Sequence, residues 1–131
     1  MNGAGRVLRT ELGRVRGLGS AKEGVQHWWM QRVTAIALIP LLLWFVIAVV
    51  AHTGQDYAAV HAWLASPVTL GLMILLVGAV FEHAQLGLQV VIEDYVHSEW
   101  LKIAAILGVK LASLVLGLAA VVALAVIAFG H

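Results

Sequence analysis

The chain has 131 residues, of which 62% are hydrophobic and only 11% are charged, and its formal net charge is +1. A typical soluble domain is about a quarter charged and about half apolar. Small soluble domains also bury the smallest fraction of the surface that their chains expose. With a mean hydropathy of +0.96, the composition excludes a soluble monomer and places most of the chain in a lipid bilayer.

The composition excludes several kinds of function as well. Eight Lys and Arg residues without a separate soluble domain do not make the basic surface that nucleic-acid binding needs. The lack of cysteine excludes disulfides, iron–sulfur clusters, Cys-ligated metals and thiol catalysis. Any cofactor must therefore be held by His, carboxylate, amide or backbone groups.

The first part of the chain is polar and basic. Residues 1–32 are Gly-rich and hold six of the eight Lys and Arg residues, and we interpret them as a cytoplasmic segment. Within them, residues 17–24 have the composition of a loop or a frayed helix. Residues 33–131 form the membrane anchor domain. Its first apolar run, 33–51, is about as long as a hydrocarbon core is thick, and it contains Pro40, which transmembrane helices tolerate.

Two more apolar spans follow, the second over 68–92 and the third over 103–129, with polar connections at 52–67 and 93–102. The stretch 58–65 can form a short helix in the membrane interface. Basic residues precede the first span and reappear at Lys102, whereas 52–67 has none. The positive-inside rule then places the N-terminus in the cytoplasm and the C-terminus in the periplasm. The predicted fold class is an all-α membrane protein with three transmembrane helices.

One face of the second span carries the residues best suited to chemistry. His83, Gly87, Val90 and Asp94 follow helical spacing, with Asp94 roughly 16 Å along the axis from His83. A neutral His near the middle of the bilayer is a usual axial haem ligand, and Gly87 would let a flat macrocycle approach. Alternatively, the His bonds a neighbouring helix and Gly87 serves helix packing. The spacing leaves both interpretations open.

Other polar residues suggest further roles. Asp94 and Tyr95 place a carboxylate beside a phenol, which suits hydrogen bonding to a quinone carbonyl, or else they mark an interfacial turn. Arg32 either snorkels to lipid phosphates or pairs with an anionic cofactor group such as a haem propionate. Glu82, Gln85 and Gln89 form a second polar stripe, for which we expect structural hydrogen bonds to a neighbouring helix rather than a hydrated proton path. We expect Lys110 to snorkel toward the cytoplasmic side.

Two segments together resemble a known family. The run from Ser20 through His27-Trp28-Trp29-Met30-Gln31-Arg32 to Ala35, and the run from His83 to His97, are similar to the small hydrophobic membrane anchor of bacterial succinate dehydrogenase, which is respiratory complex II. The resemblance covers the whole chain, and the segment from His83 to Tyr95 is its most specific part. In the family, the position before the haem His is commonly apolar, whereas here it is Glu82.

The resemblance implies a site and a set of partners. It implies that the chain packs with a second hydrophobic anchor protein into a helical bundle around haem b. His83 would be one axial ligand of the haem, the second anchor protein would supply the other His, and Arg32 and His27 would lie near the propionates. It also implies that Asp94 and Tyr95 border the ubiquinone site. The other partners would be the iron–sulfur protein, the flavoprotein and membrane lipid, in the bacterial inner membrane. Such an anchor belongs to an enzyme but has no activity by itself.

Three alternatives differ in function. A fumarate reductase anchor would run the reaction in reverse with menaquinol. A haem-free transporter component would use Glu82 as its coupling carboxylate and His83 as a relay. An assembly factor would keep electron transfer intact without His83.

Overall fold

The protein is an all-helical bundle. The computed structural model describes residues 21–130 and contains four helices, namely α3 (Ala21–His52), α4 (Tyr57–Ala65), α5 (Pro67–Tyr95) and α6 (Glu99–Phe129). Of these, α3, α5 and α6 are long and apolar enough to cross a membrane. The described part of the chain contains no strand. The predicted fold class and its three spans are therefore confirmed.

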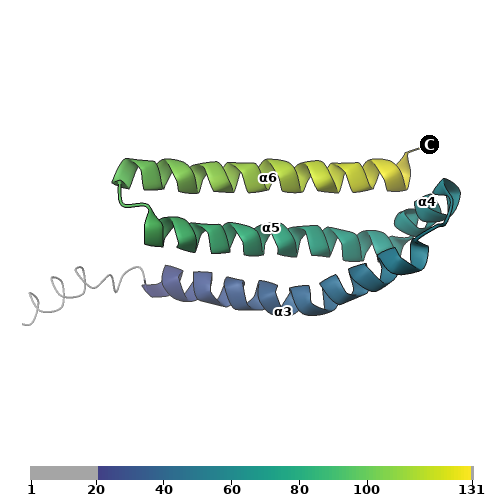
Figure 1. Cartoon of the computed structure of the whole chain (residues 1–131), viewed down its shortest axis with the longest axis horizontal. Helices are drawn as coiled ribbons and strands as arrows, with labels where there is room; N and C mark the ends of the chain where they lie inside the picture. Colours follow the sequence, from purple (N-terminus) through teal and green to yellow (C-terminus); the bar gives the residue numbers. More distant parts are fainter. Residues whose placement is uncertain (1–20, 131) are drawn as a thin grey trace, which may run out of the picture.

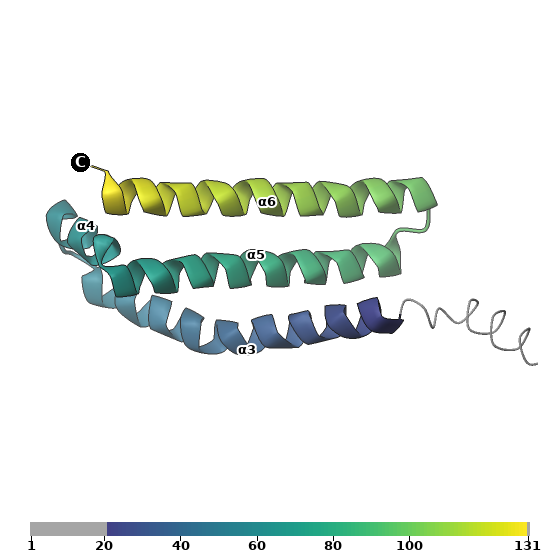
Figure 2. The same ribbon diagram turned by 180° about the vertical axis from the view of Figure 1, so that it is seen from behind.

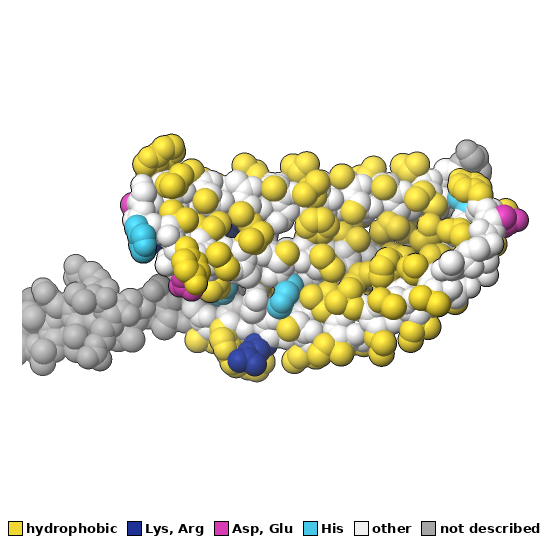
Figure 3. All heavy atoms as spheres, in the orientation of Figure 1, with side chains coloured by type: hydrophobic (Ala, Val, Ile, Leu, Met, Phe, Trp, Pro, Cys, Tyr) yellow, Lys and Arg dark blue, Asp and Glu magenta, His cyan; other side chains and the backbone are white. Residues whose placement is uncertain are grey.

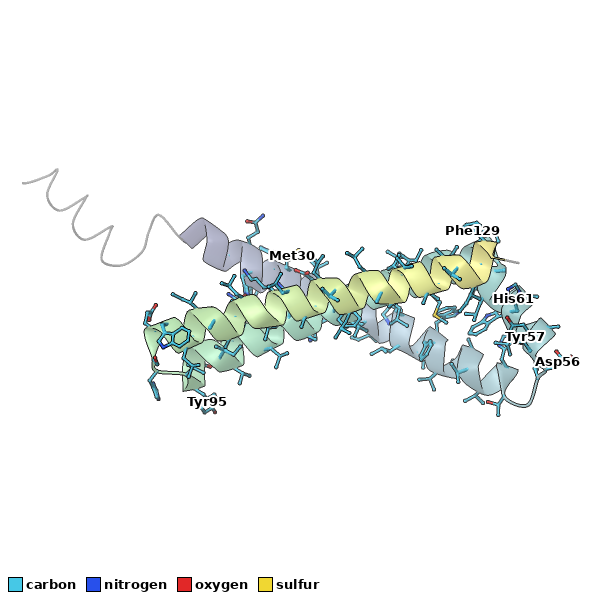
Figure 4. The ribbon with its side chains drawn as sticks, turned by 90° about the horizontal axis from the view of Figure 1, so that it is seen from above. Met30, Asp56, Tyr57, His61, Tyr95 and Phe129 are labelled. Atoms are coloured by element: carbon cyan, nitrogen blue, oxygen red, sulfur yellow. The ribbon has the colours of Figure 1, made fainter. Side chains whose placement is uncertain are left out.

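The central helix of the bundle is α5. Figure 1 shows α5 between α3 and α6, with neighbouring helices antiparallel, and Figure 2 shows the same order from behind. The start of α3, the end of α5 and the start of α6 share one end of the bundle. The short helix α4 lies across the other end, near the C-terminus. Seen from above, α3 crosses the α5–α6 pair obliquely (Figure 4).

The three long helices extend beyond the apolar runs that predicted them. Helix α3 begins at Ala21, so it contains the whole apolar run 33–51 and also Ala21–Gly24, for which a loop or a frayed helix was predicted; residues 17–20 lie outside the described part. The predicted polar turn over 93–102 is wrong in extent, because α5 continues through Tyr95 and α6 starts at Glu99. Helical hydrogen bonds need not stop where apolar side chains stop, since each backbone group is satisfied within its own helix.

The predicted short helix after the first span is present as α4. Gly54, at a φ of 84°, turns the chain after α3, a backbone conformation that side chains with a Cβ rarely adopt. Asp56 then caps α4, since its carboxylate accepts a hydrogen bond of 2.9 Å from the Ala59 N–H. Pro67 begins α5, where its missing N–H costs nothing.

A bend in α3 brings its last turns against α4. Pro40 lies inside the helix and cannot donate the usual backbone hydrogen bond, and Figure 1 shows the helix curved. Beyond the bend, the ring of His52 stacks on Trp63 of α4 with centroids 4.2 Å apart. Trp44 lies against the same indole at 6.4 Å. Aromatic contacts therefore close this end of the bundle.

The buried residues lie mainly where α5 meets its neighbours. They are Thr34, Thr69, Met73, Leu76 and Leu86. A Cβ at Gly117 of α6 would lie 3.7 Å from the Phe81 ring, which is ordinary van der Waals contact, so the Phe81 side chain of α5 packs over this glycine of α6. Helix α6 buries none of its residues. Apolar side chains cover much of the molecular surface (Figure 3), as expected where lipid or another protein surrounds a chain.

The aromatic cluster on α4 gives a first prediction. Replacing Trp63 by alanine should lower the free energy of unfolding by about 2 kcal/mol, because a half-buried indole and its two aromatic contacts are lost. Thermal unfolding of the purified protein in detergent measures the change. The matched control is Trp100→Ala, because Trp100 is 75% exposed on α6. Equal destabilisation by both variants would contradict a stabilising role for the contacts of Trp63.

Candidate functional site: a histidine held between two helices

His83 lies in the second half of α5 and bonds α3. Its Nδ1 is 3.1 Å from the hydroxyl oxygen of Thr34, a residue that is only 6% exposed. The same hydroxyl lies 2.7 Å from the backbone carbonyl oxygen of Met30, one turn earlier in α3. A hydroxyl has a single hydrogen to donate, and the short contact to the Met30 carbonyl takes it. The Thr34 oxygen therefore accepts from His83, and Nδ1 carries the ring proton.

This arrangement leaves Nε2 of His83 with a free lone pair. In a neutral imidazole, one nitrogen is a donor and the other an acceptor, so a proton on Nδ1 makes Nε2 the acceptor. Nε2 has no hydrogen-bond partner among residues 24–130, and it is not enclosed by the chain. A histidine fixed through one nitrogen and open at the other has the geometry of a metal ligand.

Gly87 faces α3 and not open space. A Cβ at this position would lie 3.8 Å from Nε2 of the Gln31 side chain, and adding it would therefore make ordinary contact. Gln31 lies one turn before Thr34 in α3, so α3 packs against α5 both at Gly87 and at His83. An alanine would fit here without a clash, so this contact does not choose between the two sequence interpretations of Gly87, helix packing and access for a macrocycle. The other residues of that predicted face, Val90 and Asp94, are exposed.

Arg32 and His27 point to different sides of α3. The guanidinium carbon of Arg32 lies 5.1 Å from the centroid of the Trp28 ring, which holds the charge on the exposed surface. His27 instead lines a polar cavity with Glu82 and Gln85, and its Nε2 is buried without a hydrogen-bond partner in the described part of the chain. Five residues of helix separate the two side chains by roughly 140°. The structure does not bring them together.

Asp94 and Tyr95 form the exposed end of α5. Tyr95 is the last helical residue and is 76% exposed, and Asp94 is exposed as well. Figure 4 places Tyr95 at one end of the bundle and Phe129 at the opposite end, with the Tyr95 side chain directed outward. The phenol and the carboxylate are therefore available to a molecule or protein that lies outside this chain.

Sequence reasoning missed Thr34 and the surroundings of Lys110. The signal for Thr34 was a hydroxyl in the first span at the depth of His83, but only antiparallel packing shows that the two meet. Lys110 lines the same polar cavity as Glu82, Gln85 and Gln89, so that stripe faces a cavity within the bundle. No cluster of three or more potential metal ligands occurs in the residues that the structure covers. His83 is therefore not part of a closed metal site formed by the described residues alone.

Comparison with known proteins places these features in a family. The family model described as the succinate dehydrogenase/fumarate reductase transmembrane subunit matches residues 6–130. The succinate dehydrogenase hydrophobic membrane anchor subunit of Rickettsia bellii is 37% identical over 88% of this chain and 93% of its own length.

Two other relatives agree. The corresponding protein of Paracoccus denitrificans is 35% identical over 71% of this chain and 72% of its own length. The succinate dehydrogenase membrane anchor subunit of Reclinomonas americana is 33% identical over 68% and 77% of the two chains. With three membrane-spanning helices, these relationships indicate a multi-pass protein of the bacterial inner membrane. The chain belongs to the family of succinate dehydrogenase and fumarate reductase transmembrane subunits and is a hydrophobic membrane anchor of the succinate dehydrogenase type.

Proposed function

We propose that the chain is the membrane anchor of a succinate:ubiquinone oxidoreductase, in which it supplies one axial ligand of haem b and part of the ubiquinone-reducing site. The observation that carries this proposal is the state of His83. Its Nδ1 is occupied by Thr34, and its Nε2 is free. The family membership supports the same function, because the relatives are named as anchor subunits of succinate dehydrogenase.

The residues present fit haem b as one half of a site. His83 would bind the iron through Nε2, and Thr34 would keep the ring oriented and its proton on Nδ1. A bound haem b would accept and return single electrons. Arg32 presents guanidinium donors on the exposed surface of α3, which suits a propionate. No group of three or more potential metal ligands occurs among the described residues, so we assign a second ligand of the iron to the second hydrophobic anchor protein of the complex.

Tyr95 and Asp94 would serve the quinone. The Tyr95 hydroxyl can donate a hydrogen bond to a quinone carbonyl, and the adjacent Asp94 carboxylate can accept and pass on a proton. Both groups are exposed at the end of α5. A quinone there must be enclosed by other proteins of the complex, and the electrons must come from an iron–sulfur protein because this chain has no cysteine to hold a cluster. That protein would receive them in turn from the flavoprotein.

The names of the relatives favour succinate oxidation as the direction of the reaction. The family description includes fumarate reductase, but the relatives described above are named for succinate dehydrogenase. A haem-free transporter component has no comparable support from the relatives. We therefore retain the ubiquinone-reducing assignment as the proposal that spectra and kinetics can test.

The first test concerns His83. Replacing His83 by alanine should abolish or alter the low-spin b-type band in the reduced-minus-oxidised spectrum of the purified complex, because one iron ligand is lost. The control His61→Ala changes a histidine at the opposite end of the bundle and should leave the band unchanged. A complex without the band, or a band unaffected by His83→Ala, would refute the haem assignment.

The second test concerns Thr34. Thr34→Val removes the hydroxyl while keeping the shape, and we expect about a tenfold or greater loss of haem affinity because the ring loses its orienting partner. Thr34→Ser keeps the oxygen and should behave like the wild type. Haem titration and the reduction potential of the complex measure the effect. Equal behaviour of the valine and serine variants would show that the hydrogen bond has no such role.

The third test separates the quinone site from the haem site. Tyr95→Phe should reduce the rate of ubiquinone reduction by roughly tenfold or more, since one hydrogen bond to the reacting carbonyl is lost, while the haem content stays near normal. Tyr57→Phe, at the other end of the bundle, is the control. Loss of haem with unchanged quinone kinetics would mean that the two sites are assigned in reverse.

A further inference from the structure

A polar cavity lies between α3, α5 and α6, on the side of α5 that carries Glu82. Its volume is about 600 Å³, and its polar lining consists of His27, Glu82, Gln85, Gln89, Glu93 and Lys110. These residues come from the first turns of α3, the second half of α5 and the first half of α6. The cavity therefore occupies the end of the bundle that we predict to face the cytoplasm.

The charged groups of this cavity are not paired with one another, and two of them, Glu93 and Lys110, are exposed. Two carboxylates and one ammonium line it, yet no ion pair forms within the part of the chain that the structure describes. Gln89 donates a hydrogen bond of 2.9 Å to Glu93, and Nε2 of His27 is buried and unpaired among the described residues. Charges inside a membrane protein are costly unless another group meets them. The cavity thus suits a molecule with both a cation and an anion.

An apolar groove continues from this cavity along α5 and α6. The groove has a volume of about 330 Å³ and shares Glu82 and Gln85 with the cavity. Its apolar lining includes Ile74, Gly78, Leu114 and Leu118. The axial distance from Glu93 to Ile74 is roughly 28 Å at the helical rise per residue. One leaflet of a bilayer is about 20–22 Å thick, so the two spaces together are long enough for a whole lipid.

We propose that this combined site binds one zwitterionic aminophospholipid of the cytoplasmic leaflet. The Lys110 ammonium would bind the phosphate, and Glu93, near the end of α5, would bind the outermost ammonium group of the lipid. One acyl chain would then lie in the groove between Ile74 and Leu118. From the end of α5 inward, Glu93, Lys110 and the groove would thus meet the ammonium, the phosphate and the acyl chain in the order in which the lipid carries them. The bound molecule would join α3, α5 and α6 on the side of α5 that carries Glu82.

Charge distinguishes this ligand from the other amphiphiles. A quinone offers two carbonyl acceptors and no cation, so it would leave both carboxylates of the cavity uncompensated. An anionic phospholipid would bind Lys110 through its phosphate but would bring no cation for Glu93. A head group that carries both signs offers a partner of opposite charge to Lys110 and to Glu93.

The test uses the intact complex purified in detergent, with lipids and quinones extracted and quantified by mass spectrometry. Lys110→Met should lower the bound phosphatidylethanolamine by about tenfold, because a charged partner of the phosphate is lost. Lys102→Met is the matched control, since Lys102 lies in the first turns of the same helix outside the cavity and groove. Gly78→Leu tests the groove, because a Cβ there meets nothing within 4 Å and a larger side chain can fill the space.

Further measurements separate the outcomes. Glu93→Gln should shift the lipid bound after exchange from phosphatidylethanolamine toward phosphatidylglycerol. Native gels show whether each variant still assembles with its partner proteins. The proposal would be overturned if the wild type, Lys110→Met and Gly78→Leu complexes held equal amounts of phosphatidylethanolamine. It would also be overturned if the variants lost bound quinone and kept their phospholipid. A wild-type complex without bound phospholipid would overturn it too, by showing that a partner protein fills the site. The Tyr95→Phe and His83→Ala experiments read different signals, so the haem and quinone proposals can fail without this one.

Discussion

The hydrogen bond between Thr34 and His83 determines how the first two spans can meet. It joins a buried hydroxyl of α3 to an imidazole of α5 at 3.1 Å. Apolar contacts allow one helix to slide or rotate on another, whereas a hydrogen bond inside a membrane selects one register. Because the bond uses Nδ1, it also decides that Nε2 is the nitrogen presented to the outside of the chain.

The two sides of α5 therefore face different surroundings. On one side, His83 and Gly87 lie against α3, and the free nitrogen of His83 suits a cofactor shared with another protein. On the other side, Glu82 begins a polar stripe that faces a cavity near Lys110. Adjacent residues of a helix point about 100° apart, so two neighbours in sequence can serve two separate surfaces.

The chain by itself provides only part of each proposed site. It would supply one of the two axial ligands of the haem, and its Asp94 and Tyr95 are exposed. Helix α6 buries none of its residues, and large apolar side chains cover the outside of all three spans. These features are expected of a protein whose remaining surface is covered by lipid and by the other members of a complex. The family assignment agrees with this interpretation.

Much of this protein can be predicted without its tertiary structure. Apolar runs of membrane-spanning length specify three helices, and the residues from His83 to Tyr95 identify the family. Helix ends were predicted less well, because hydropathy marks where apolar side chains stop and not where backbone hydrogen bonding stops. The surroundings of Gly87, the separation of His27 from Arg32 and the cavity around Lys110 depend on how the helices cross.

Sequence by itself determined the spans and the residues capable of chemistry, since composition and period are local properties. Only the tertiary structure decided that Thr34 holds His83, because that contact joins residues 49 positions apart on antiparallel helices.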